Sequence, residues 1–137
     1  MPQLPVPAKA APGLSLEEMK QFVRQHFEDF VNRGLTDVAL KNLSSDFLDH
    51  DEPYGESVGN EIAKRMMDGV LQRWPDLHVT VEDAIAEGDQ VIVRNHWHFT
   101  DPNTGKKMEF HGFVQWRFAN EKIVERWATI TPPKEIS

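Results

Sequence analysis

The sequence contains no cysteine among its 137 residues. A chain without thiols cannot form disulfides, thiolate zinc sites or iron–sulfur clusters, and it has no cysteine nucleophile. Basic residues are outnumbered, since 15 Lys and Arg stand against 22 Asp and Glu and leave a net charge of −7. This balance argues against sequence-independent binding to nucleic acid, which requires a basic surface.

Long hydrophobic runs are also missing. No apolar stretch approaches the roughly 20 residues that span a bilayer, and the first residues lack the apolar stretch of a signal peptide. We therefore expect a cytoplasmic protein that binds neither a membrane nor nucleic acid. The chain has no Gly-rich phosphate loop and no lysine placed for a Schiff base, so we expect no organic cofactor.

What the chain does contain is typical of one folded domain. It has four Trp, eight Phe and 39% hydrophobic residues, enough for a core. Its length fits a single domain. Residues 1–14 hold four of the nine prolines, which favours an extended Pro- and Ala-rich arm. We therefore divide the chain into this arm and one domain over residues 15–137.

The first half of the domain has the period of helices. Ser15 and Glu18 form a capping-box pattern, and apolar residues then recur at three- and four-residue intervals up to Gly34. The same reasoning predicts a short helix over about 36–43 and a third helix over about 60–73, with an extended segment at 47–52 between them.

From Leu77 onward the period changes to two, which indicates strands. Turn-forming residues at 87–89, 101–105 and 120 divide this half into four strands. Three helices followed by an antiparallel meander predict an α+β fold. Alternation also sorts the side chains of the last three strands into two faces. The inner face is apolar apart from Asn95 and Glu125, and the outer face carries Arg94, His96, His98, Glu109, His111, Gln115, Arg117 and Arg126.

Five segments, taken in order, resemble a known family. They are 47–51 (FLDHD), 74–77 (WPDL), 81–89 (VEDAIAEGD), 104–106 (TGK) and 122–127 (KIVERW). Over about residues 15–133 the chain is similar to SnoaL-like polyketide (ester) cyclases of the nuclear transport factor two-like superfamily. The resemblance implies a cone-shaped, barrel-like fold in which three helices pack on a curved antiparallel sheet of four to five strands around a deep apolar pocket.

The resemblance also implies a class of function. It points to a small-molecule enzyme that performs cofactor-free proton transfer, in a cyclisation, isomerisation or dehydration of an apolar oxygenated substrate. Glu52 stands where related isomerases carry a general base before a Pro-x-Gly turn, and His50 is a second candidate base. Asp51 and Glu125 are the fallback carboxylates.

Several positions depart from the enzymes of this superfamily. The tyrosine and the carboxylic acid that donate to the oxyanion in the isomerases fall at Phe27 and Val114, which cannot donate. Thr131 stands where many cyclases carry a catalytic Asp. These departures argue against both standard reactions, and they leave open a non-catalytic ligand-binding or protein-interaction domain.

Other residues are expected to shape the pocket. Asn95 is a lone amide on the apolar face. Burying it unpaired costs on the order of 1–3 kcal/mol, so we expect it to meet either a ligand or a protein partner, namely Glu125 or a helix end. In the enzyme interpretation, Asn95 and Thr131 orient the ligand. His26 is interpreted as a core histidine whose hydrogen bonds are satisfied within the protein. The predicted pocket lining consists of Phe27, Met66, Trp97, Val114, Trp116 and Trp127.

The outer face suggests a further alternative. If the hairpin turns at 101–105, His96 lies opposite His111 and His98 opposite Glu109, a ligand set that suits zinc, iron or manganese. Arginines predicted on the same face oppose cation binding. In the superfamily the outer face is often a dimer contact, so we expect a homodimer and no metal as the first interpretation.

Overall fold

The computed structural model describes residues 9–10, 13–52 and 55–136. The side chain of Glu52 also lies outside the described part, although its backbone belongs to a strand. The first two strands, β1 (Lys9–Ala10) and β2 (Leu14–Ser15), pair with each other. Thus Lys9 and Ala10 of the predicted arm belong to a short antiparallel pair, and residues 1–8 and 11–12 are outside the described residues.

The predicted helices are present with small changes at their ends. In α1 (Leu16–Phe27), the Ser15 hydroxyl accepts from the Glu18 amide and the Glu18 carboxylate accepts from the Ser15 amide, which confirms the capping box. A π-helical turn over Glu28–Asn32 continues α1. The remaining helices are α2 (Val38–Asn42) and α3 (Asn60–Arg73), the latter with the predicted bounds.

The main sheet is larger than predicted. Its order is β4-β3-β8-β7-β6-β5, with β9 added beside β7, which makes seven strands among the described residues instead of the predicted four or five. All neighbours are antiparallel except β3 and β8, which run parallel. The strands are β3 (Leu43–Glu52), β4 (Gly55–Val58), β5 (His78–Glu87), β6 (Gln90–Thr100), β7 (Lys107–Ala119), β8 (Lys122–Ile130) and β9 (Lys134–Glu135).

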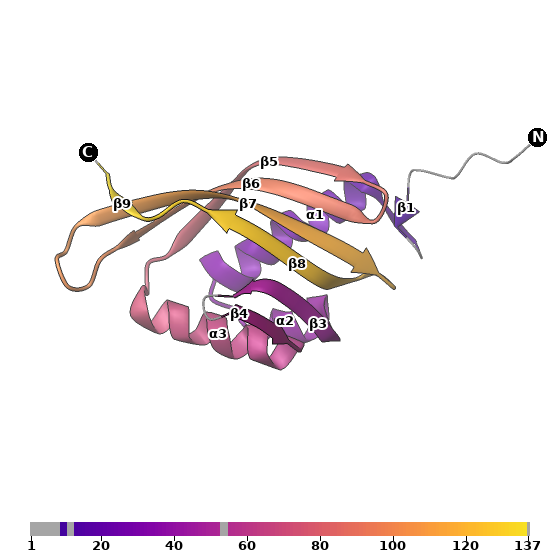
Figure 1. The fold of residues 1–137 in the computed structure, drawn as a ribbon, viewed down its shortest axis with the longest axis horizontal. Coiled ribbons are helices and arrows are strands. Elements are labelled where there is room, and N and C mark those ends of the chain that lie inside the picture. Colours follow the sequence, from indigo (N-terminus) through magenta and orange to yellow (C-terminus); the bar gives the residue numbers. More distant parts are fainter. Residues whose placement is uncertain (1–8, 11–12, 53–54, 137) are drawn as a thin grey trace, which may run out of the picture.

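The sheet bends around the helices, as the fold class requires. Figure 1 shows the long strands β5 to β8 crossing α1, with β3, β4, α2 and α3 below them. Fully buried side chains from both layers meet between them, and they include Met19, Val23, Leu43, Phe47, Val91, Val93, Val114, Phe118 and Ile123. In the described part of the chain, the helices are too short or too polar to cross a lipid bilayer.

One irregularity in β8 changes which side chains face the core. Arg117 pairs with Glu125, but the next residue, Phe118, pairs with Ile123, so Val124 is an extra residue in β8. Such a β-bulge reverses the alternation of the residues that follow it. Arg126, which lies opposite the buried Trp116, therefore faces inward.

Candidate functional site

A cavity lies between the helices and the inner face of the sheet. Its volume is about 40 Å³, which is room for roughly three water molecules. Most of the wall is apolar and comes from α1, the turn after it, β3, α3, β6 and β7: Phe27, Phe30, Val31, Leu43, Phe47, Ala63, Met66, Met67, Trp97 and Trp116. Three ionisable side chains complete the wall, namely His26, Asp49 and Arg126.

Asp49 and Arg126 form an ion pair in this wall. The two residues are directly paired across the parallel strands β3 and β8. Arg126 Nη1 donates to both carboxylate oxygens of Asp49, at 2.9 and 3.0 Å, and only 3% of Asp49 is exposed. The guanidinium also lies 5.6 Å from the ring centre of Trp116, a cation–π contact. The cavity therefore holds a carboxylate whose position is fixed by a cation.

His26 is the second ionisable group in the wall and comes from α1. Its ring stacks on Phe30 with the ring centres 4.8 Å apart, and Asn42 Nδ2 lies 3.0 Å from its Nδ1. Burial and the positive charge of Arg126 lower the His26 pKa to about 4, so the imidazole is neutral at physiological pH. Because the Asn42 amide donates to Nδ1, the ring proton resides on Nε2, which makes that nitrogen a donor.

The cavity wall has more donors than acceptors. His26 Nε2, Trp97 Nε1 and Trp116 Nε1 are all buried and have no hydrogen-bond partner among the described residues. Buried polar groups usually find a partner, and each one that does not costs on the order of 1–3 kcal/mol. Three unpaired N–H groups in one wall therefore suit a ligand that brings oxygen acceptors.

Asn95 on β6 is also buried and unpaired. It is 0% exposed, and neither its amide oxygen nor its amide nitrogen has a partner in the described structure. Neighbouring strands place Val81 and Gly112 beside it. Asn95 is not part of the cavity wall. It lies two residues before Trp97 on the same side of β6, and Trp97 does line the cavity.

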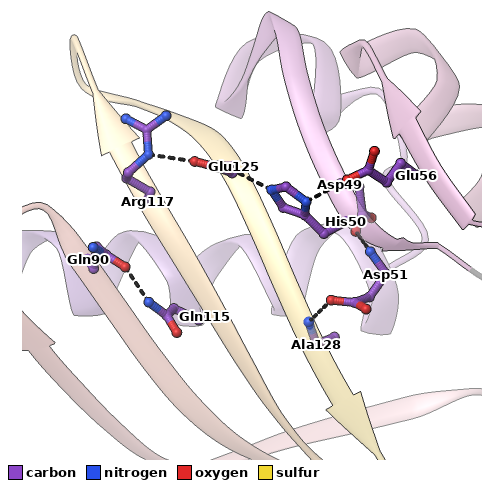
Figure 2. Close-up of polar contacts among 9 residues, drawn as sticks. All are labelled: Asp49, His50, Asp51, Glu56, Gln90, Gln115, Arg117, Glu125 and Ala128. Carbon is purple, nitrogen blue, oxygen red and sulfur yellow. Dashed lines mark hydrogen bonds and ion pairs between the residues drawn. The ribbon is translucent and has the colours of Figure 1, made fainter.

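His50, the second candidate base, faces away from this cavity and is not part of its wall. Figure 2 shows it between two carboxylates, with Nδ1 2.8 Å from Glu56 and Nε2 2.6 Å from Glu125. Arg117 Nε donates to the other oxygen of Glu125 at 2.7 Å. The hydrogen bond with Glu125, followed by the one with Glu56, raises the His50 pKa, and the His50 and Arg117 donors lower the Glu125 pKa.

The bulge at Val124 accounts for three wrong orientations. Strict alternation places Glu125 and Trp127 on the inner face and Arg126 on the outer face, and the structure has all three reversed. Trp127 stacks on His50 with the ring centres 5.0 Å apart, instead of lining the cavity. Alternation along the chain places Asp49 on the same, inward side as Phe47. A carboxylate on that side requires a partner, and this requirement could have indicated that Arg126 faces inward.

The remaining predicted residues occupy varied positions. Phe27, Met66, Trp97 and Trp116 line the cavity, whereas Val114 is fully buried in the core outside the cavity wall. Two predicted polar groups make backbone contacts instead. The exposed Asp51 accepts from the Ala128 amide at 2.8 Å, and the exposed Thr131 accepts from the His111 amide at 2.9 Å. The proposed base Glu52 has its side chain outside the described residues.

Comparisons with known proteins agree with this fold. AclR, a proposed hydroxylase from Streptomyces galilaeus, is 26% identical and superposes with a TM-score of 0.74, covering 85% of this chain and 91% of that chain. IdmH, a proposed polyketide cyclase from Streptomyces antibioticus, is 21% identical with a TM-score of 0.71, covering 80% and 89%. A hypothetical protein with a ketosteroid isomerase-like fold from Catenulispora acidiphila is 14% identical with a TM-score of 0.71, covering 80% and 84%.

The sequence comparison is consistent with these structural matches. No curated protein sequence matches the chain significantly. A family model described as SnoaL-like polyketide cyclase matches residues 21–131, which is most of the chain and includes every residue of the cavity wall. The fold is therefore one that small-molecule enzymes use, and the chain belongs to the SnoaL-like polyketide cyclase family.

Proposed function

We propose that the chain is a small-molecule enzyme that performs cofactor-free proton transfer on an apolar, oxygenated substrate bound in the inner cavity. The observation that carries this proposal is the wall itself, which combines a fixed carboxylate, Asp49, with three buried N–H groups that lack acceptors. A carbonyl oxygen that becomes an enolate is an acceptor whose hydrogen bonds strengthen as charge develops on it.

The residues of the wall divide into two roles in this proposal. The Asp49 carboxylate removes a proton from the carbon next to the substrate carbonyl. The electron pair of that C–H bond forms a carbon–carbon double bond, and the π electron pair of the carbonyl moves to its oxygen. The N–H groups of His26, Trp97 and Trp116 donate to that oxygen. A neutral imidazole suits this role because it donates without giving up its proton. These donors replace the ones that Phe27 and Val114 cannot provide.

The size of the cavity sets a requirement on substrate entry. A volume of about 40 Å³ does not hold a ring system, so side chains must move when a substrate binds. Met66 and Met67 on α3 form part of the wall, and methionine side chains adapt readily to new shapes. We propose that displacement of these two side chains enlarges the cavity. Cyclisation, isomerisation and dehydration all fit the same first step.

Hydrogen–deuterium exchange into a bound ketone tests the proposal without knowledge of the natural substrate. The probe is acetylnaphthalene, a flat apolar methyl ketone, incubated with the protein in D₂O. If Asp49 removes and returns methyl protons, the ketone acquires deuterium, which NMR measures. Asp49→Asn should slow the exchange by about 100-fold or more, since the amide cannot act as a base.

The control keeps the chemistry of the substitution but moves it away from the cavity. Asp51→Asn changes a carboxylate two residues along the same strand, which contacts the Ala128 amide on the exposed side, and it should leave the exchange unchanged. Trp116→Phe offers a second test that keeps Asp49 in place. Equal exchange in the wild type and the Asp49→Asn variant, with both folded, would contradict the proposed role of Asp49.

A second candidate function is a non-catalytic ligand-binding domain. Its supporting observation is that every unpaired polar group in the cavity wall, among the described residues, is a donor, and donors alone can hold an acceptor-bearing ligand without reaction. Saturable binding of acetylnaphthalene without any deuterium uptake would favour this alternative over the enzyme.

We also propose that the chain forms a homodimer through the outer face of the sheet. Exposed apolar side chains support it, since Ile85, Ile92 and Phe113 on β5, β6 and β7 are 70%, 41% and 56% exposed. Sedimentation at micromolar concentration should give a dimer, and Phe113→Glu should give a monomer. Leu40→Glu, a similar change at an exposed leucine on α2, serves as the control. A monomeric wild type would contradict the proposal.

A further inference from the structure

The outer face of the sheet carries a second group of ionisable side chains, on the side of β6 and β7 opposite the inner cavity. His96 on β6 lies directly opposite His111 on β7, and Glu109 precedes His111 by two residues on the same face. The rings of His96 and His111 stack with their centres 4.7 Å apart. Two imidazoles and one carboxylate therefore meet on adjacent strands, where the backbone fixes their spacing.

The ligand atoms of these three side chains are close to the spacing that a metal ion requires. His96 Nε2 and His111 Nε2 lie 2.8 and 3.9 Å from the same oxygen of Glu109, and all three ligand atoms are within 4.8 Å of one another. Ligands bound to zinc at 2.0–2.1 Å in a tetrahedron are about 3.3 Å apart. Small side-chain rotations therefore suffice.

The arginines that argue against a cation on this face prove to be neutralised or elsewhere. Arg94 is paired with Asp83 and Glu82, and Arg117 is paired with Glu125. Arg126 is on the inner face with Asp49. Lys134 on β9 lies opposite Glu109 in the strand register and does bring positive charge near the Glu109 carboxylate.

The accessibility of the group also suits an ion from solution. The side chains of His96, Glu109 and His111 are 28%, 21% and 49% exposed, so an ion can reach them without opening the core.

From this geometry we propose that His96, Glu109 and His111 form a zinc-binding site on the outer face. His96 Nε2, His111 Nε2 and one Glu109 oxygen bind the ion, and water completes a tetrahedron. Two imidazoles with one carboxylate form a donor set that zinc accepts with an open position. Zinc displaces the hydrogen bond between His96 and Glu109 and links β6 to β7.

Calorimetric titration with zinc chloride tests the proposal on the full chain without a polyhistidine tag. We expect one zinc ion per chain. His96→Asn, Glu109→Gln and His111→Asn should each weaken zinc binding by about 100-fold. Loss of a residue that only hydrogen-bonds to a metal ligand already weakens binding by about 10- to 100-fold, and loss of the ligand itself should cost at least as much. Titration with cobalt(II), whose visible absorption reports four-coordinate geometry, gives a readout of the ligand set.

His78→Asn is the matched control for these variants. His78 is on the same face in β5 and its ring stacks on His98, 5.0 Å centre to centre, but it is not one of the three residues of the group. This variant should bind zinc as the wild type does. Zinc binding by the wild type at less than about a tenth of an equivalent, or equal affinity in all four variants, would overturn the proposal. Circular dichroism verifies that each variant is folded.

Discussion

Arg126 on β8 holds Asp49 on β3 through two hydrogen bonds, across 77 residues of sequence. Their side chains are 19% and 4% exposed, so the pair is largely removed from water. It joins the two strands that run parallel in the sheet, and it forms the charged part of the inner cavity wall. The same contact therefore serves both the fold and the proposed chemistry.

Loss of one member of this pair should destabilise the protein. Asp49→Asn leaves the Arg126 charge without its counterion, and breaking a buried pair in this way costs about 3 kcal/mol. Arg126→Met should have a similar effect, measured as the free energy of unfolding in urea. In the double variant the loss should be smaller than the sum. If the loss of unfolding free energy in the double variant equals the sum of the two single losses to within about 0.5 kcal/mol, the two residues are not coupled.

His26 should remain neutral far below the usual pH for histidine. Its pKa is about 4 in the folded chain, compared with 6.5 for a histidine in water. As the pH falls from 6.5 to 4, the unfolded chain therefore takes up a proton and the folded chain does not. The stability that depends on neutral His26 is present above pH 6.5 and is lost over this interval, by about 3 kcal/mol.

Two measurements check this behaviour. NMR titration of the imidazole resonances should show His26 unchanged until about pH 4. In His26→Phe, the free energy of unfolding should fall by about 3 kcal/mol less than in the wild type over the same interval. A His26 resonance that titrates near 6.5 would show that the ring is accessible to water.

His50 should titrate in the opposite direction. Its hydrogen bonds with Glu125 and Glu56 raise its pKa, so the stability gained from protonated His50 is present below pH 6.5 and is lost as the pH rises through the folded-state pKa. Glu125→Gln removes the larger of these effects, and the His50 pKa should fall in an NMR titration. The pKa of His26 serves as an internal control, and an unchanged His50 value would contradict the assigned contact.

The buried amide of Asn95 should reduce the stability of the protein. Both of its amide atoms are buried and unpaired in the described structure, so replacement by the similarly shaped leucine should increase the free energy of unfolding by about 1–2 kcal/mol. A less stable Asn95→Leu variant would show that the amide has a partner, such as an internal water.

Much of the fold could be predicted because its signals are local. The capping box at Ser15 and Glu18 and the period of residues 60–73 depend on neighbours three or four positions away. The same is true of the strands after Leu77, where alternation alone indicates the two faces of β6 and β7. The hairpin register that brings His96 opposite His111 follows from the turn at 101–105.

The site could be predicted only in part because it depends on contacts between distant segments. The extra residue Val124 in β8 reverses the alternation after it, and nothing in the local sequence marks that position. The pairing of β3 with β8, which gives Asp49 its partner Arg126, is equally non-local. His26 is correctly predicted as buried. That its Nε2 is an unpaired donor, however, follows only from the contact of Asn42 with Nδ1, which the sequence does not indicate.

The most direct test of the central claim compares two ligands that differ in one acceptor. Acetylnaphthalene and ethylnaphthalene have nearly the same shape, but only the ketone can accept hydrogen bonds from the buried N–H groups. By isothermal titration we expect the ketone to bind at least about fivefold more tightly, the value of one net hydrogen bond near 1 kcal/mol, and Trp116→Phe to reduce the difference. Equal affinities for the two ligands, or no binding of either, would contradict a cavity built to hold an oxygen acceptor.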